Sequence, residues 1–509
     1  MWGQCGLSLT CAGFRERADL FRLFRGAETL FQGQENTAGC RRLLAVTLGV
    51  LGAAAPAFAA GGVPLLWVPG APLLAALLAW TCRDSGRWFL GFAAASLLFP
   101  PLPVPAGESG PHVAIAFAAL GLWRGATRLG QWRVPLNLMT VSALALSLAM
   151  LLSVACALLY SGPQVAAGSF ARVALFGISL YALLYFAYGP VTDEVPEPLR
   201  WAYRLYALGI ASALFACVDF YFQLTPPAGF GEQFVWLPSG IYRRAQGMFY
   251  EAGVLGNLCS FFLVWMTLAW VRPVRPEISP KILAAGGLVF SAALLFSFSR
   301  SSLLSVAAAL ATLLALCRNE LKPRRVLPVA LAAIGAALVL TYLLFPTFVE
   351  SYLLRLVYSG LDFGEKPDTV LGGRLTTWGT ILGLLAANPA KLLFGVGFKS
   401  LPYGGLGGEP IIADNMYVSM LAETGIVGLA ALLLFLAAIL WNAYRAARSP
   451  EKAASFLGMW IFCFWIGELL QMLSVDALTY WRVLPLYFAV LGLAVRERDR
   501  YDRGGLPSA

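Results

Sequence analysis

The sequence predicts an all-α, polytopic membrane helix bundle, and three observations lead to that class. Of the 509 residues, 59% are hydrophobic and only 13% are charged, which leaves too little polar surface to cover a soluble globule. The mean hydropathy is +0.72. Apolar runs long enough to cross about 30 Å of hydrocarbon recur along the whole chain. A soluble enzyme is therefore excluded.

These apolar runs predict about 12 to 14 transmembrane helices, given the length that a bilayer requires. The third and fourth runs are the shortest. The predicted helices begin near Leu43, Val63, Trp88, Pro111, Pro135, Phe170, Trp201, Gly247, Ile282, Ser302, Val326, Ile426, Ala454 and Val483.

The distribution of basic residues predicts the orientation. If the N-terminus is cytoplasmic, 26 of the 37 Lys and Arg residues fall in cytoplasmic segments, as the positive-inside rule requires. The net charge of +10 then reflects topology rather than nucleic-acid binding. We therefore predict a multi-pass membrane protein with both termini in the cytoplasm.

Four regions follow from this pattern. Residues 1–42 are a basic cytoplasmic segment, 43–223 hold the N-terminal helices, 224–495 hold helices and two long outer loops, and 496–509 form a cytoplasmic tail. The nine cysteines are scattered without a C-x-x-C spacing, so neither a disulfide framework nor a zinc site is indicated. The lone histidine, His112, excludes a histidine triad or a His-rich metal site.

The two outer loops are the natural place for chemistry, because loops this long are uncommon unless they are functional or disordered. One runs from residue 223 to 246, and the other covers 346–412. Within the second loop, residues 374–385 carry apolar residues on one helical face and are followed by Asn388-Pro389. We predict a short interfacial helix there, with Arg374 in its first turn.

Four arginines lie on the predicted outer face, where the positive-inside bias disfavours them: Arg243, Arg244, Arg300 and Arg374. Arginine binds phosphate oxygens with a bidentate fork, which suits a diphosphate held at the lipid headgroup level. The alternative is that each arginine caps a helix or pairs with a headgroup.

Carboxylates near the same face supply the second candidate set. Asp414 is either the N-cap of the following helix or a general base whose pKa burial raises. Glu251 and Glu423 enter apolar helices, where pairing with an outer arginine is the simplest explanation. The remaining embedded acids are interpreted as polar contacts within the bundle; they are Asp219, Glu468 and Asp476.

Several short motifs occur in a fixed order over residues 240 to 475. They are Arg-x-x-Gly-x-x-x-Glu (Arg244 to Glu251), Ser-Arg-Ser-Ser (Ser299 to Ser302), Gly-Gly-Arg-x-x-x-Trp (Gly372 to Trp378), Gly-Val-Gly (Gly395 to Gly397), and Asp-Asn-x-Tyr followed by Glu-Thr-Gly-Ile-x-Gly-Leu (Asp414 to Leu429). This succession resembles the O-antigen ligase and polymerase superfamily.

The resemblance implies a GT-C-like membrane glycosyltransferase that needs no metal or other cofactor. Such enzymes take a glycan from an undecaprenyl-diphosphate-linked donor at the outer leaflet and join it to a sugar hydroxyl of a lipid-linked repeat or of lipid A core. By motif position, the resemblance implies Asp414, Arg300 and Arg374 as catalytic residues. The implied substrate-binding residues are Arg243, Arg244, Glu251, Asn415 and Tyr417.

The branch of the superfamily depends on one position. O-antigen ligases carry a histidine where this chain has Asp414, and Tyr417 in Asp-Asn-x-Tyr is more similar to the polymerase branch. We therefore favour a polymerase over a ligase. Two other classes remain open: a lipid or glycan transporter, because intramembrane acids also occur in transporters, and a non-catalytic member of the family.

Overall fold

A computed structural model describes the chain mainly over residues 84–318 and 373–504. Gaps lie at 102–111, 191–194, 196, 225–232, 238–239, 250 and 274–278, and at 405 and 407–409; Thr81, Glu320, Val339, Tyr342, Leu343 and Asp368 are described singly. By its internal contacts the chain divides into two compact units, 1–83 and 84–509. The basic segment 1–42, the helices predicted near Leu43, Val63 and Val326, and nearly all of residues 346–372 lie outside the described residues.

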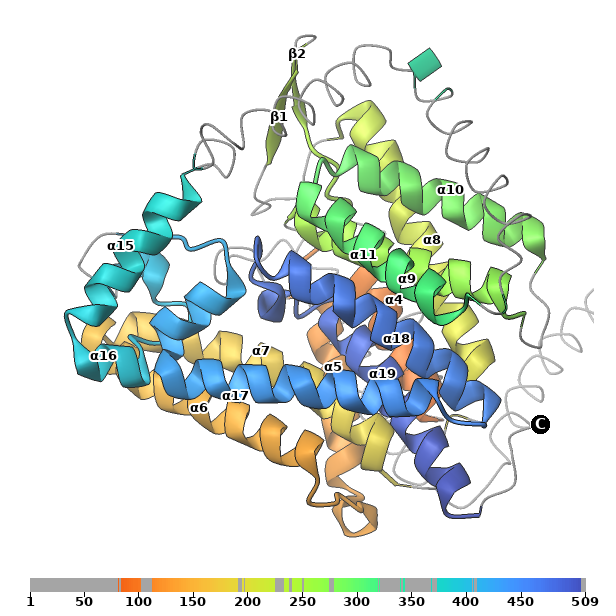
Figure 1. Ribbon diagram of the computed structural model, residues 1–509, viewed down its shortest axis with the longest axis horizontal. Helices are drawn as coiled ribbons and strands as arrows, with labels where there is room; N and C mark the ends of the chain where they lie inside the picture. Colours follow the sequence, from red (N-terminus) through yellow and green to blue (C-terminus); the bar gives the residue numbers. More distant parts are fainter. Residues whose placement is uncertain are drawn as a thin grey trace, which may run out of the picture. The chain divides into compact units, whose positions relative to one another are not determined.

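The described part of the chain is helical apart from one hairpin (Figure 1). It contains 13 α-helices, three short 3-10 helices and two strands. In chain order they are α4 (Ser85–Leu98), α5 (Val113–Ala126), η1 (Leu129–Gln131), α6 (Leu138–Ser161), α7 (Pro163–Tyr188), α8 (Pro198–Phe222), β1 (Phe234–Leu237), β2 (Gly240–Arg243), α9 (Ala252–Val271), α10 (Pro280–Phe296), α11 (Arg300–Leu316), α15 (Arg374–Ala386), α16 (Pro389–Phe394), η3 (Leu401–Tyr403), α17 (Met416–Ala447), α18 (Lys452–Gln471), η4 (Ala477–Thr479) and α19 (Leu484–Asp502).

The prediction of a polytopic helix bundle is confirmed. Within the described ranges, six helices are long and apolar enough to cross a membrane: α6, α7, α8, α9, α17 and α18. Three shorter apolar helices accompany them, namely α5, α10 and α11. Every predicted helix start that falls on described residues has a helix at or near it. The total number of spans, and the side of the membrane on which each end lies, stay predictions.

The hairpin was not predicted, because an all-α fold leaves no place for strands. In it, β1 pairs with β2 in antiparallel register, with Phe234 opposite Arg243. The Gln223 side chain ties it to α8, since its carbonyl oxygen accepts from the Arg243 backbone N–H at 2.9 Å. This tie holds the residues that follow the hairpin against the end of α8.

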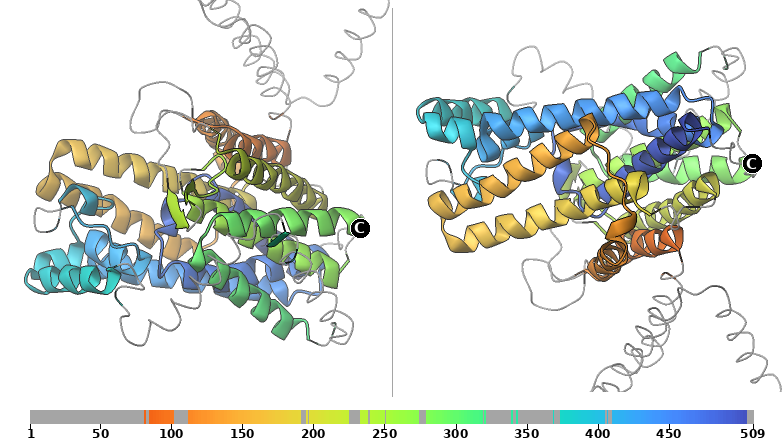
Figure 2. Two further views of the ribbon diagram at one scale, coloured as in Figure 1. Left: turned by 90° about the horizontal axis from the view of Figure 1, so that it is seen from above. Right: turned by 90° about the horizontal axis from the view of Figure 1, so that it is seen from below.

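Two groups of helices form the bundle (Figures 1 and 2). One contains α6, α7 and α17, which lie side by side, and α19 packs against α7. In the other, α9 packs against α10, α11 and α18. The two groups join where α18 contacts both α17 and α19. At this junction the buried Asn257 amide donates to Glu468, and the Tyr487 hydroxyl donates to Asn257 at 2.5 Å. The prediction of Glu468 as a bundle contact is confirmed.

Helix α17 is broken at Gly425, which has φ 71° and ψ −173°. The break removes helical partners from nearby carbonyls, and a buried carbonyl without a partner is costly. The Gly-Val-Gly segment satisfies two of them: Val396 N–H donates to the Ala422 carbonyl at 3.0 Å, and Gly397 N–H donates to the Glu423 carbonyl at 2.9 Å. We call this pairing of residues 395–397 with residues 422–425 the glycine clasp.

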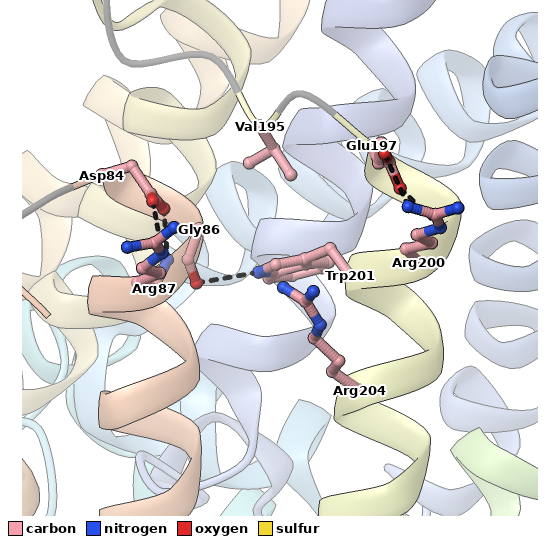
Figure 3. A pocket seen from close by; sticks show the side chains of 8 residues that line it. All are labelled: Asp84, Gly86, Arg87, Val195, Glu197, Arg200, Trp201 and Arg204. Atoms are coloured by element: carbon pink, nitrogen blue, oxygen red, sulfur yellow. Dashed lines mark hydrogen bonds and ion pairs between the residues drawn. The ribbon is translucent and has the colours of Figure 1, made fainter. Parts of the chain in front are cut away.

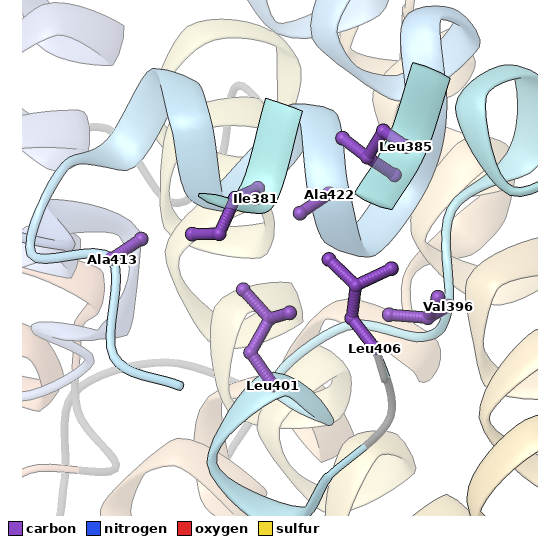
Figure 4. Close-up of a cluster of buried hydrophobic side chains, with 7 residues drawn as sticks. All are labelled: Ile381, Leu385, Val396, Leu401, Leu406, Ala413 and Ala422. Atoms are coloured by element: carbon purple, nitrogen blue, oxygen red, sulfur yellow. The ribbon is translucent and has the colours of Figure 1, made fainter. Parts of the chain in front are cut away.

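Apolar packing completes the attachment of α15 and α16 to α17 (Figure 4). Ile381 and Leu385 of α15 are fully buried against Ala422 of α17 and the loop residues around them. The predicted short helix at 374–385 is therefore confirmed as α15, with Arg374 as its first residue, and its position at the membrane interface stays a prediction. It packs on the bundle and is not simply part of an open loop.

The glycine clasp should be intolerant of a side chain. A Cβ at Gly425 would collide with the Leu393 carbonyl and would sit on a left-handed backbone, so we expect Gly425→Ala to cost about 2 kcal/mol or more. Gly379→Ala is the matched control, because a Cβ there meets nothing within 4 Å and helix propensity favours alanine. Thermal unfolding in detergent should show a lower Tm for the first variant only; equal Tm values would contradict the clasp.

Candidate functional site

An ion pair joins the beginnings of α15 and α17. The Arg374 guanidinium lies 3.1 Å from the Asp414 carboxylate, and their side chains are 30% and 51% exposed. The Trp378 indole N–H donates to the Ala413 carbonyl at 2.7 Å, which fixes the loop before α17 against α15. This ion pair is therefore held by buried packing while both of its charges stay open to solvent.

Asp414 does not cap α17, so that alternative is wrong. The N-cap is Asn415, whose side-chain oxygen accepts from Tyr417 N–H at 3.0 Å and Val418 N–H at 3.2 Å. Asp414 is also not buried, and its φ of 46° is unusual for a non-glycine residue. Its carboxylate therefore points away from the helix end and contacts Arg374.

Asn415 and Tyr417 both have structural hydrogen bonds. Asn415 is buried as the N-cap, and the Tyr417 hydroxyl donates to the Leu469 carbonyl at 3.0 Å. These hydrogen bonds give both residues a structural role, because they fix the start of α17 against α18. Their predicted part in substrate binding stays a prediction.

Arg244 and Arg300 lie at the turn between α10 and α11. The Arg244 Nε donates to the Ser297 carbonyl at 2.7 Å, and Ala245 N–H donates to the Phe296 carbonyl at 2.9 Å. Arg300 is the exposed first residue of α11, after the N-cap Ser299. The structure thus brings two of the predicted arginines to one short turn.

Arg243 faces the interior instead. Its guanidinium pairs with Asp219 at 2.5 Å, with both side chains 8% exposed, and also donates to the Leu224 carbonyl at 2.6 Å. The interpretation of Asp219 as a bundle contact is confirmed. This ion pair explains why an arginine is tolerated at this buried position. The predicted contact of Arg243 with substrate stays a prediction.

Glu251 links the two arginine-bearing regions electrostatically. It precedes α9, its side chain is solvent-accessible, and it does not cap the helix. Protein atoms around the carboxylate displace part of its hydration and so raise its pKa; Lys399 opposes that rise, and Asp476 and Asp414 add to it. Arg244 also lowers the pKa of Glu251. Glu251 is therefore close enough to feel both Asp414, beside α15, and Arg244, beside the α10–α11 turn.

Sequence analysis missed Lys399, which is the central cation of this region. Its ammonium pairs with Asp476. Burial alone would lower its pKa, but the carboxylates of Asp476, Glu423 and Glu251 raise it, so the lysine is charged. The predicted pairing of Glu251 and Glu423 with an outer arginine stays a prediction, and Lys399 is a cation near both carboxylates that the sequence did not identify. The available signal was a lysine two residues after the Gly-Val-Gly motif, in a segment that the charge pattern predicts to lie on the outer side.

We refer to Glu251, Lys399, Glu423 and Asp476 as the acidic cluster. Glu423 is 1% exposed, and its Oε2 has no hydrogen-bond partner in the described part of the protein. Asp476, interpreted as a polar contact within the bundle, forms an ion pair with Lys399, a partner that the sequence did not identify. The cluster adjoins the glycine clasp, because Lys399 lies two residues after Gly397 and Glu423 belongs to the clasp itself.

The lone histidine serves a structural role. His112 caps α5 through its Nδ1, which accepts from Ala114 N–H at 3.1 Å. Burial and the nearby Arg482 lower its pKa to about 3, so the ring is neutral. It takes no part in the charged region described above.

The chain was compared with known protein families. Residues 285–433 match the family model described as O-antigen ligase. The chain carries an O-antigen ligase family domain. This similarity implies an enzyme of the O-antigen ligase or polymerase type, and such enzymes act in surface polysaccharide biosynthesis. No curated protein matches the chain.

The O-antigen ligase family domain holds most of the site. Its matched residues include α10, α11, α15, α16 and the beginning of α17. Arg300, Arg374 and Asp414 therefore fall inside the family domain, whereas Arg244 and Glu251 precede it. The predicted resemblance is confirmed over this central stretch.

Lys399 should be required for folding. Removing one partner of a buried ion pair leaves an uncompensated charge, and such changes cost about 3–5 kcal/mol. We expect Lys399→Gln to lower the Tm strongly, and Lys399→Gln combined with Asp476→Asn to recover part of the loss. The exposed Lys281→Gln is the control and should change the Tm little. If the decreases in Tm caused by Lys399→Gln and by Asp476→Asn simply add in the double variant, the two residues do not stabilise the fold through their ion pair, and the prediction is contradicted.

Proposed function

We propose that the chain polymerises glycan repeat units. The donor is an undecaprenyl-diphosphate-linked glycan at the outer leaflet, and the acceptor is a sugar hydroxyl of a second lipid-linked unit. The observation that carries the proposal is the solvent-open Arg374–Asp414 ion pair, held at the beginning of α17. It offers a phosphate-binding cation and a carboxylate acceptor in one place.

In this proposal the arginines bind the diphosphate. Arg374 and the two arginines of the α10–α11 turn, Arg244 and Arg300, supply bidentate donors that a lysine does not match. Neutralising the diphosphate makes it a good leaving group, because negative charge accumulates on it as the glycosidic carbon–oxygen bond breaks. All three residues keep part of their surface exposed.

Asp414 then accepts the proton of the attacking hydroxyl. Its present partner, Arg374, is the same cation that a diphosphate would engage. Donor binding would therefore exchange one anion for another at Arg374 and free Asp414 for the acceptor. The new bond forms between the acceptor oxygen and the anomeric carbon, the diphosphate leaves with the electron pair of the broken bond, and Asp414 holds the proton.

The second candidate is an O-antigen ligase that joins the glycan to lipid A core. The similarity of residues 285–433 to the O-antigen ligase family favours it. In that reading Asp414 stands where ligases carry a histidine, and both groups can accept a hydrogen bond from a hydroxyl. The two candidates differ in the acceptor and share the donor site.

Transfer should depend on Asp414. With purified protein in proteoliposomes and a polyprenyl-diphosphate-linked repeat unit, we expect Asp414→Asn to lower transfer by a factor of about 10² or more, the scale for loss of a general base. The product should be a ladder of lengthening glycans on gels. Asp414→His should keep part of the activity if the position needs only an acceptor.

Three outcomes of this assay separate the alternatives. A single transfer that occurs only when lipid A core is supplied would assign the ligase reaction. Full activity of Asp414→Asn at normal expression would remove the general base from the proposal. No product with either acceptor, from protein with a normal Tm, would contradict glycan transfer by this chain.

The outer-leaflet reaction also requires the predicted orientation. Cysteines introduced near Gly231 and Gly405, in a variant lacking accessible native cysteines, should react with an impermeant thiol reagent added to intact cells. Cysteines near Asn319 and Ser449 should not, because the basic residues around them favour the cytoplasm. The reverse labelling pattern would put Arg374 and Asp414 on the cytoplasmic side, out of reach of the donor.

A further inference from the structure

A second cationic site lies where α4 and α8 begin. The structure has a cavity of about 170 Å³ there, well above the ~10–15 Å³ that one water molecule needs. Figure 3 shows the side chains around it. They are Asp84, Gly86, Arg87, Val195, Glu197, Arg200, Trp201 and Arg204. We call this cavity the α4–α8 pocket.

The pocket is far from the Arg374–Asp414 pair along the bundle. It lies at the first turns of α8. At the opposite end of α8, Gln223 follows the last residue of the helix and accepts a hydrogen bond from the Arg243 backbone N–H. A helix of 25 residues is about 37 Å long, which exceeds the thickness of the hydrocarbon core. The two cationic sites therefore belong to opposite membrane faces.

The charges in the pocket favour an anion. Arg87 pairs with Asp84 at 2.8 Å, and Arg200 pairs with Glu197 at 2.7 Å, each within one helical turn. Such partly exposed pairs contribute little stability, so both arginines can turn to a stronger anion. Arg204 is exposed and forms no ion pair with the described residues, which leaves the pocket with one excess positive charge.

The backbone adds donors to the same place. The first N–H groups of a helix carry partial positive charge, and here two helices begin beside one cavity. Asp84 caps α4, but no side chain caps α8. Trp201 forms a rigid wall, since it is buried and its indole N–H donates to the Gly86 carbonyl at 3.1 Å. Figure 3 shows the Arg204 guanidinium beside this indole, between the two helices.

We propose that the α4–α8 pocket binds a phosphate group at the membrane face opposite the Arg374–Asp414 pair. The arginine fork matches phosphate oxygens, and Arg204 is the residue that a new anion would engage first. Two sources offer this chemistry: the headgroup of an anionic phospholipid, or a soluble phosphate. The site is independent of the glycan-transfer site, so either proposal can fail without the other.

Binding by the purified full-length protein tests the proposal. Native mass spectrometry with phosphatidylglycerol, with phosphatidylcholine as the zwitterionic comparison, measures lipid retention, and calorimetry with inorganic phosphate measures the soluble source. We expect the protein to retain phosphatidylglycerol and Arg204→Gln to weaken that binding about tenfold or more, the usual loss for one charged hydrogen-bonding partner. Arg445→Gln is the matched control, because Arg445 is also exposed near a helix end but lies outside the pocket.

The outcomes distinguish the sources. Binding of inorganic phosphate that Arg204→Gln weakens, without preference for phosphatidylglycerol, would support the pocket and assign it to soluble phosphate. If Arg204→Gln does not elute as a monodisperse protein, Arg200→Gln decides, since it leaves the Glu197 charge unopposed and should weaken binding at least as much. Equal affinity of the wild type and a folded pocket variant for both ligands would overturn the proposal.

Discussion

The break in α17 at Gly425 is the constraint on which the site depends. Inside a bilayer, backbone groups that lose their helical partners must find others within the protein. Here the Gly-Val-Gly segment supplies two N–H donors to the carbonyls of Ala422 and Glu423. The two segments of the clasp approach so closely that a Cβ on Gly395 would collide with the backbone of residue 423. Glycine is required on both sides for this steric reason.

The clasp determines where the charged residues lie. It fixes the loop that follows α16, so that Lys399 is held between Asp476 and the buried Glu423. It also anchors α15, whose first residue is Arg374, beside the start of α17. Lys399 and Asp414 both have left-handed backbones, with φ of 59° and 46°. Non-glycine residues in this region are uncommon and concentrate at functional sites, which agrees with placing the proposed chemistry here.

Sequence patterns predicted local structure well and tertiary partners poorly. Helix starts followed from hydrophobicity, and α15 followed from its apolar face and the Asn388-Pro389 stop, because these signals are local. The clasp did not follow, because it pairs segments about 30 residues apart and nothing in Gly395 or Gly425 alone identifies the partner. The same reason hid the Lys399–Asp476 pair. Whether Asp414 caps α17 stayed open at the level of sequence because Asp and Asn are both good N-caps, and the structure gives the cap to Asn415.

The cost of burying charge separates structural from chemical residues in this protein. Several charged residues inside the bundle have fixed partners: Arg243 pairs with Asp219, Lys399 pairs with Asp476, and Glu468 accepts a hydrogen bond from Asn257. Breaking such a contact to bind a ligand would leave a charge in a medium of low dielectric constant, so these residues are poorly suited to exchange partners. The Arg374–Asp414 pair differs, since water can solvate either charge when the pair opens. A ligand anion can therefore displace Asp414 at small cost, and the residues best suited to meet a substrate are the ones that the bundle leaves half-exposed.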